Sequence, residues 1–164
     1  MKSWVKALAV IGGAVVASSP AGAQGVLVQH DVSVHMGIAI AEAALEKCIA
    51  DGVSASVAVV DRAGRLRVFL QGDQAAPHNI ELARRKAYTA LTFGISTADW
   101  AKRTIDNPDL AAQRQLGEVI ALRGGIPIKM GDEVIGAVGV SGSKTGGDES
   151  CAMAGAAKAA DLMK

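Results

Sequence analysis

Aromatic residues are scarce in this chain of 164 residues, which holds two Trp, one Tyr and two Phe. A hydrophobic core with so few rings has to be built from Ala, Val, Ile and Leu. The many Ala and the 19 Gly residues predict helices that pack closely on a sheet. The sequence also lacks an internal repeat and a low-complexity linker, so a single domain is expected.

An excess of charge of either sign is missing as well. The chain has 17 Lys and Arg against 16 Asp and Glu, which gives a formal net charge of +1. This balance argues against a nucleic-acid partner, because such proteins need a basic stripe or a high isoelectric point. A phosphate loop is not expected either, since Ser143 separates Gly142 from Lys144 where that motif requires Gly-Lys. No G-x-S-x-G nucleophile elbow is present, and no catalytic residue is assigned.

Long apolar runs are absent except near the N-terminus. Residues 1–23 have the pattern of a secretory signal peptide, with Lys2 and Lys6 before a short apolar run and small residues at Ala21–Ala23. That run is shorter than the roughly 20 residues needed to span a bilayer. We therefore expect cleavage before Gln24, a domain over residues 24–164, periplasmic or secreted localisation and no stable membrane insertion.

Cysteine is nearly absent, and the two that occur are Cys48 and Cys151. Neither has a second Cys or His at zinc spacing, so a zinc site is not expected. In an oxidising compartment the two could form a disulfide, which would stabilise the fold by about 4–5 kcal/mol in the chain-entropy model. Two buried free thiols in Ala-rich helices are the alternative, and the sequence leaves both open.

Apolar periodicity predicts the secondary structure. Helices are expected over residues 36–50, 79–93 and 149–163, the last capped by Asp148, with shorter ones from a capping box at Ser96 and over 109–116. Strands are expected over 54–61, 66–70, 126–130 and 133–140. The last is apolar on both faces, which predicts a central strand, and its glycines allow another backbone to come close. This order predicts an antiparallel sheet between layers of helices.

The most informative stretch for function runs from Pro77 to Phe93. It places His78 at the start of a helix, where partial positive charge favours the neutral, metal-ligating imidazole. Three cations that could hold carboxylates follow within two turns: Arg84, Arg85 and Lys86. At most one or two of them can face the same side of the helix. An imidazole beside anchored carboxylates suits a haem site, and the alternative is a solvated histidine beside a solvated basic face.

Three further residues are weaker candidates for ligand contacts. Tyr88 could donate a hydrogen bond to a ligand, although a helical Tyr at the edge of the core is the alternative role. His30 and His35, five residues apart before the first helix, could reach one metal ion together, and two solvated side chains are the alternative.

Three sequence blocks, taken together, resemble the GlcG/HbpS-like family, which also occurs as the C-terminal domain of PduO-type proteins. They are VSASVAVVDRAGRLRVF at Val53–Phe69, PHNIELARRKAYTALTF at Pro77–Phe93 and EVIGAVGVSGSKTGGDESCAMAG at Glu133–Gly155. Each block alone is a weak signal, but their order and spacing are specific. The chain departs from the usual pattern at residues 71–75, where QGDQA replaces Arg-x-Asp-Gly-Ala, and His78 stands where other members often have serine.

The resemblance implies an α/β (α+β) sandwich with a five-stranded antiparallel sheet, sandwiched by helices and often assembled into homo-oligomers. Some members bind haem, others are linked to corrinoids, and the family has been called haem-degrading. We therefore expect a haem-binding carrier, scavenger or sensor, with His78 as iron ligand and Arg84, Arg85, Lys86 and Tyr88 near the cofactor in an apolar pocket. The alternatives are a protein that binds an organic acid or corrinoid for a catabolic pathway, and an enzyme of oxidative haem degradation.

Overall fold

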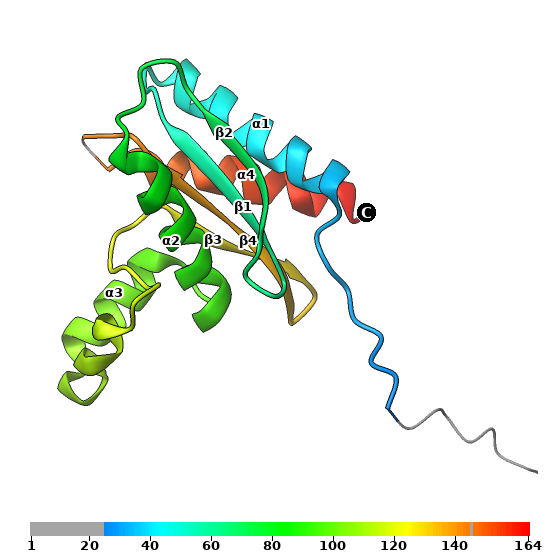
Figure 1. Ribbon diagram of the computed structural model, residues 1–164, viewed down its shortest axis with the longest axis vertical. Helices are drawn as coiled ribbons and strands as arrows, with labels where there is room; N and C mark the ends of the chain where they lie inside the picture. The colour runs from blue at the N-terminus through cyan, green and yellow to red at the C-terminus, as the bar shows by residue number, and fades with distance from the viewer. Residues whose placement is uncertain (1–24, 145) are drawn as a thin grey trace, which may run out of the picture.

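The structure is a computed structural model that describes residues 25–144 and 146–164. The predicted signal peptide therefore lies outside the described residues. Within them, one sheet is flanked by helices on both faces (Figure 1). None of the described helices combines the length and the apolarity that crossing a membrane requires.

The sheet has four strands in the described part of the chain, in the order β2-β1-β4-β3, and all neighbours are antiparallel. The strands are β1 (Ser56–Asp61), β2 (Leu66–Gln71), β3 (Gly125–Met130) and β4 (Glu133–Ser141). All lie within two residues of the boundaries that alternation predicted. The central position of β4, between β1 and β3, is confirmed.

The expectation of a fifth strand is wrong for these residues. The apolar segment that precedes β3 satisfies its backbone through side chains of a helix instead of a neighbouring strand. The carbonyl oxygen of Val119 accepts a hydrogen bond from Arg85 at 2.5 Å, and the amide of Ile120 donates to the hydroxyl of Thr89 at 2.9 Å. Because these groups already have partners, this segment has no need of a strand ladder.

The helices form two layers around the sheet. On one face lie α1 (Val34–Ala50) and α4 (Asp148–Leu162), which pack against each other. On the other face lies α2 (His78–Phe93), followed by α3 (Thr97–Asp106) and the 3₁₀ helix η1 (Pro108–Gln115), which extend away from the sheet (Figure 1). The predicted arrangement of helices on both sides is therefore confirmed.

A disulfide joins the two helices of the first layer. Cys48 of α1 and Cys151 of α4 are bonded, with Cα atoms 5.4 Å apart and both side chains fully buried. The question that the sequence left open is thus answered in favour of the disulfide over two free thiols.

The absence of a side chain at Gly139 lets α2 lie directly on β4. A Cβ atom at this position would be 2.1 Å from the carbonyl oxygen of Ala83, far inside any normal contact. The sequence-based expectation of a close backbone approach at the glycines of this strand is confirmed. As a consequence, the first turn of α2 sits beside Ser141, the last residue of β4.

Candidate functional site

Two helices begin at the same end of the sheet, where β4 ends. A pocket of about 290 Å³ lies between the first turns of α2 and α4. Its walls come from α2, from the loop before β3, and from the loop that joins β4 to α4. The lining residues are Ala76, His78, Asn79, Leu82, Lys86, Leu122, Arg123, Ser141, Gly142, Ser143, Lys144 and Asp148.

A buried ion pair forms the floor of the pocket. The ammonium of Lys86 lies 2.7 Å from Asp148 Oδ2, and the two side chains are only 4% and 9% exposed. Lys86 also donates to the carbonyl oxygen of Val140 at 2.8 Å, and Asp148 Oδ1 accepts from the amide of Ser143 at 2.7 Å. The expected helix-capping role of Asp148 is therefore wrong, because its carboxylate bonds across to α2 and to the preceding loop.

Lys86 lies on the buried face of α2 because it stands at helical spacing from buried alanines. Ala83 and Ala90 stand three residues before it and four residues after it, on the side of the helix that packs on the sheet. A Cβ atom at Gly124 would approach the Lys86 ammonium to 3.2 Å and Asp148 Cβ to 2.8 Å. Glycine at this position therefore leaves the room that the ion pair occupies.

A second polar group beside the ion pair comes from β4 and the first turn of α2. Ser141 and Asn79 are 3% and 6% exposed, and the Ser141 hydroxyl donates to Asn79 Oδ1 at 3.2 Å. Within the described residues, the amide NH₂ of Asn79 has no protein partner, and the residue lines the pocket. A donor that opens into the pocket is thus available to a ligand.

The rim of the pocket is exposed and basic. His78 is the first residue of α2, and its exposed side chain lines the pocket mouth together with Arg123 and Lys144. Among the residues that the structure describes, no side chain caps the first turn of α2 or of α4. The uncapped amides of both helices therefore add partial positive charge to this end of the molecule.

The structure does not bring the other three predicted residues to this pocket. Arg84 points to the surface, where it pairs with Glu81 at 3.1 Å and Glu118 at 2.6 Å. The hydrogen bonds that Arg84 donates to those carboxylates raise its pKa, with Glu81 contributing most. Arg85 is bound to the carbonyl oxygen of Val119. Consecutive helical residues point about 100° apart, so three adjacent cations cannot share one site.

Tyr88 lies nearly three turns beyond His78 on α2, near the turn that joins β1 and β2. Its ring approaches Gly64 and lines a separate hollow together with Arg62 and Thr92. Of the five residues predicted to contact a cofactor, only His78 and Lys86 therefore share the pocket. Aliphatic side chains line the walls of this pocket, as expected, but charged and polar side chains form its floor.

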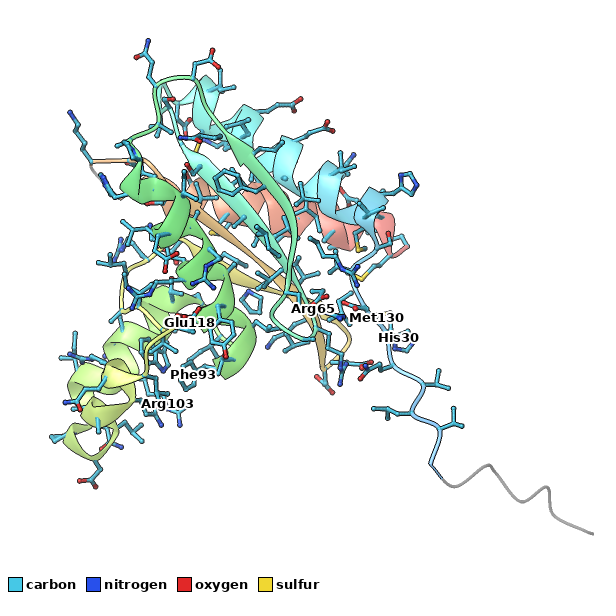
Figure 2. The ribbon with its side chains drawn as sticks, in the orientation of Figure 1. His30, Arg65, Phe93, Arg103, Glu118 and Met130 are labelled. Atoms are coloured by element: carbon cyan, nitrogen blue, oxygen red, sulfur yellow. A yellow bond between two sulfur atoms is a disulfide. The ribbon has the colours of Figure 1, made fainter. Side chains whose placement is uncertain are left out.

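The other two histidines lie far from His78 along the sheet. His30 Nδ1 is 2.8 Å from the carboxylate of Glu133, the first residue of β4, and Figure 2 labels it on the segment that leads into α1. His35 is exposed on α1. Groups of three His, Cys, Asp or Glu side chains that could hold a metal ion do not occur in residues 25–144 and 146–164.

Sequence reasoning did not identify Asp148, Asn79 and Ser141 as residues of the site. One signal was available: Lys86 interrupts the Ala-rich buried face of α2, and a lysine at such a position requires a buried acceptor. Which acidic residue supplies it depends on the distance between α2 and α4, which the sequence does not specify.

Similarity to known proteins extends over most of the chain. A sequence profile of the family described as "Haem degrading protein HbpS-like" matches residues 33–157. Protein GlcG of Escherichia coli strain K12 is 31% identical over 110 residues, which cover 67% of this chain and 81% of GlcG.

Two solved structures share the fold. The crystal structure of a double mutant of HbpS from Streptomyces reticuli has a TM-score of 0.76 and 35% identity, covering 89% of this chain and 97% of that one. The crystal structure of PduOC in complex with heme has a TM-score of 0.69 and 26% identity, covering 77% and 93%. By its sequence match and its fold, the chain belongs to the HbpS-like family.

Proposed function

We propose that this protein binds haem at the pocket between α2 and α4, as an exported carrier, scavenger or sensor that works as a homo-oligomer. The observation that carries the proposal is the position of His78, which offers an exposed imidazole at the mouth of a pocket. The similarity to PduOC, whose structure was solved with heme, and the description of the family support it.

The residues around the pocket can contact both the porphyrin ring and the carboxylates of a haem. The aliphatic side chains of Leu82 and Leu122 can contact a porphyrin face, and Arg123 and Lys144 can pair with its carboxylates. A neighbouring hollow of about 450 Å³ also includes Lys144 and continues past Gln74, so the groove extends beyond the pocket itself.

A porphyrin would be only partly enclosed here. The pocket of about 290 Å³ lies at the lower limit of typical ligand sites. Bound haem would therefore lie across the mouth with part of the ring outside, where a second subunit could cover it. This geometry supports the proposed oligomer as well as a role in binding and release.

Haem bound here would supply an iron centre with one position ligated by protein. The chain itself would contribute His78 as the ligand, the two leucines as an apolar wall and the rim cations as anchors for the propionates.

The proposal of export is supported by the disulfide. Cys48–Cys151 is a bond of the kind that persists in oxidising compartments such as the bacterial periplasm. Together with the signal-peptide pattern of residues 1–23, it favours a periplasmic or secreted protein. Mass spectrometry of protein exported by a bacterial host tests this, with an N-terminus at Gln24 as the expected result.

A haem titration followed at the Soret band tests the binding function. Wild-type protein should bind with a shifted Soret maximum, and His78→Ala should change that spectrum and weaken binding about tenfold or more. His35→Ala is the matched control, since it removes an exposed histidine from a different helix. An unaltered spectrum in His78→Ala would exclude this residue as the ligand, and no binding by wild type would refute the function.

Oxidative haem degradation is the second candidate, favoured by the description of the family. It requires loss of the haem spectrum with a reductant and oxygen, together with a defined product. Free haem bleached by peroxide is the necessary control. A stable haem spectrum under reducing, aerobic conditions would refute haem degradation and leave haem binding as the function.

A further inference from the structure

The floor of the pocket between α2 and α4 contains hydrogen-bond donors that the protein does not use. The ammonium of Lys86 has three protons, and among the described residues two are taken by Asp148 and Val140. The amide NH₂ of Asn79 also lacks a protein partner there, although the residue is 94% buried at 6% exposure. Both donors face the pocket, so water or a bound ligand can accept from them.

The charges around these donors favour a single negative charge. Lys86, Arg123 and Lys144 line the pocket together with one acidic residue, Asp148. The uncapped first turns of α2 and α4 add partial positive charge. Asp148 offsets the charge of Lys86 on the floor, however, and its repulsion of a doubly charged phosphate there is about twice its repulsion of a singly charged carboxylate.

The walls of the pocket are apolar above this polar floor. Ala76, Leu82 and Leu122 line it beside the buried donors. A ligand that fits both parts has a charged head and a short aliphatic stem. A planar carboxylate with two acceptor oxygens can take one hydrogen bond from Lys86 and another from Asn79.

We propose that the floor of this pocket is a binding site for a carboxylate group carried on a short apolar stem. Two kinds of molecule carry this chemistry: a haem propionate and a free short-chain carboxylic acid. The first source rests on the proposed haem function, and the second does not. In both, Asn79 and Lys86 bind the carboxylate, and His78 remains at the mouth.

Thermal unfolding of the full protein tests whether the site binds a free carboxylic acid. Butyrate should raise the melting temperature in proportion to its concentration at constant ionic strength. Butyramide, which has the same shape without the charge, should not, and inorganic phosphate should have less effect than butyrate. A haem titration with haem and with haem dimethyl ester tests the propionate, and esterification should weaken binding about tenfold if the propionate occupies the site.

Single and double variants test whether ligand binding depends on the residues of the pocket floor. Asn79→Ala should weaken binding of butyrate, or of haem relative to its ester, about tenfold. The double variant Lys86→Met with Asp148→Asn removes the ammonium without leaving a buried charge and should weaken binding at least as much. Arg84→Met is the matched control, because it removes a cation of the same helix that points away from the pocket.

The outcomes separate this site from the haem function. Binding of butyrate with no binding of haem would refute the haem function and support the carboxylate site. Haem binding that is insensitive to esterification, with no effect of butyrate, would overturn the carboxylate site and leave the haem function in place. Equal weakening by Asn79→Ala and Arg84→Met would also overturn the assignment.

Discussion

Replacing Lys86 with alanine should destabilise the protein strongly, because it leaves the carboxylate of Asp148 buried without its counter-ion. Asp148 is 6% exposed, and among the described residues it would keep only the hydrogen bond from the amide of Ser143. Breaking a buried ion pair by removing one partner costs about 3–5 kcal/mol. That is a large part of the 5–15 kcal/mol that typically stabilises a domain.

The same loss can be expressed as a melting temperature. Unfolding entropies of about 2.1 cal/mol/K per residue give a domain of this size a shift of about 3–4 °C per kcal/mol. Lys86→Ala should therefore melt roughly 10–17 °C below wild type. Urea unfolding followed by far-UV circular dichroism measures the free energy directly.

The double variant Lys86→Met with Asp148→Asn tests the cause. It keeps the shape of the pair without a charge, so its loss of stability should be below about 2 kcal/mol. A double-mutant cycle made of Lys86→Met, Asp148→Asn and the double variant should give a coupling energy of at least about 2 kcal/mol. The reasoning is refuted if Lys86→Ala costs less than about 1 kcal/mol, or if the double variant is as unstable as the single one.

Three further predictions concern the fold. Reducing the disulfide between Cys48 and Cys151, which are 103 residues apart, should lower the free energy of unfolding by about 4–5 kcal/mol. Urea unfolding with and without dithiothreitol measures this, and a loss below about 1 kcal/mol would contradict it. Gly139→Ala should cost about 3 kcal/mol or more, because the new Cβ atom would meet the backbone of α2 at 2.1 Å. Gly117→Ala, where nothing lies within 4 Å, is the control in the same unfolding assay and should have little effect. Asp61 is buried, which raises its pKa, but hydrogen bonds from the neighbouring arginine outweigh burial and hold the pKa below the usual 3.8. Its contribution to stability is thus present above that pH and is lost as the pH falls further; Asp61→Asn should be less stable than wild type at pH 7, and the difference should shrink below pH 3.8. A stability difference between wild type and Asp61→Asn that stays constant down to pH 2 would argue against an ion pair between Asp61 and the neighbouring arginine.

The sequence alone determined the elements and the family. Apolar patterns and turn residues located all four described strands, and Val134–Val140, apolar on both faces, was correctly placed in the centre of the sheet. The capping box at Ser96 was confirmed, since its hydroxyl accepts from the amide of Asp99 at 3.0 Å. These features are local, because hydrogen bonds within a few residues and burial of one face decide them.

Only the tertiary structure decided which side chains meet. The sequence offered His78, Arg84, Arg85, Lys86 and Tyr88 as one site, but α2 brings only His78 and Lys86 to the pocket and turns the other three away from it. Whether Cys48 and Cys151 are bonded depended on the packing of α1 against α4. The partners of Lys86 come from segments more than fifty residues away, at separations of 54 and 62. Contacts at such separations depend on the distance between packed layers, which apolar periodicity does not encode.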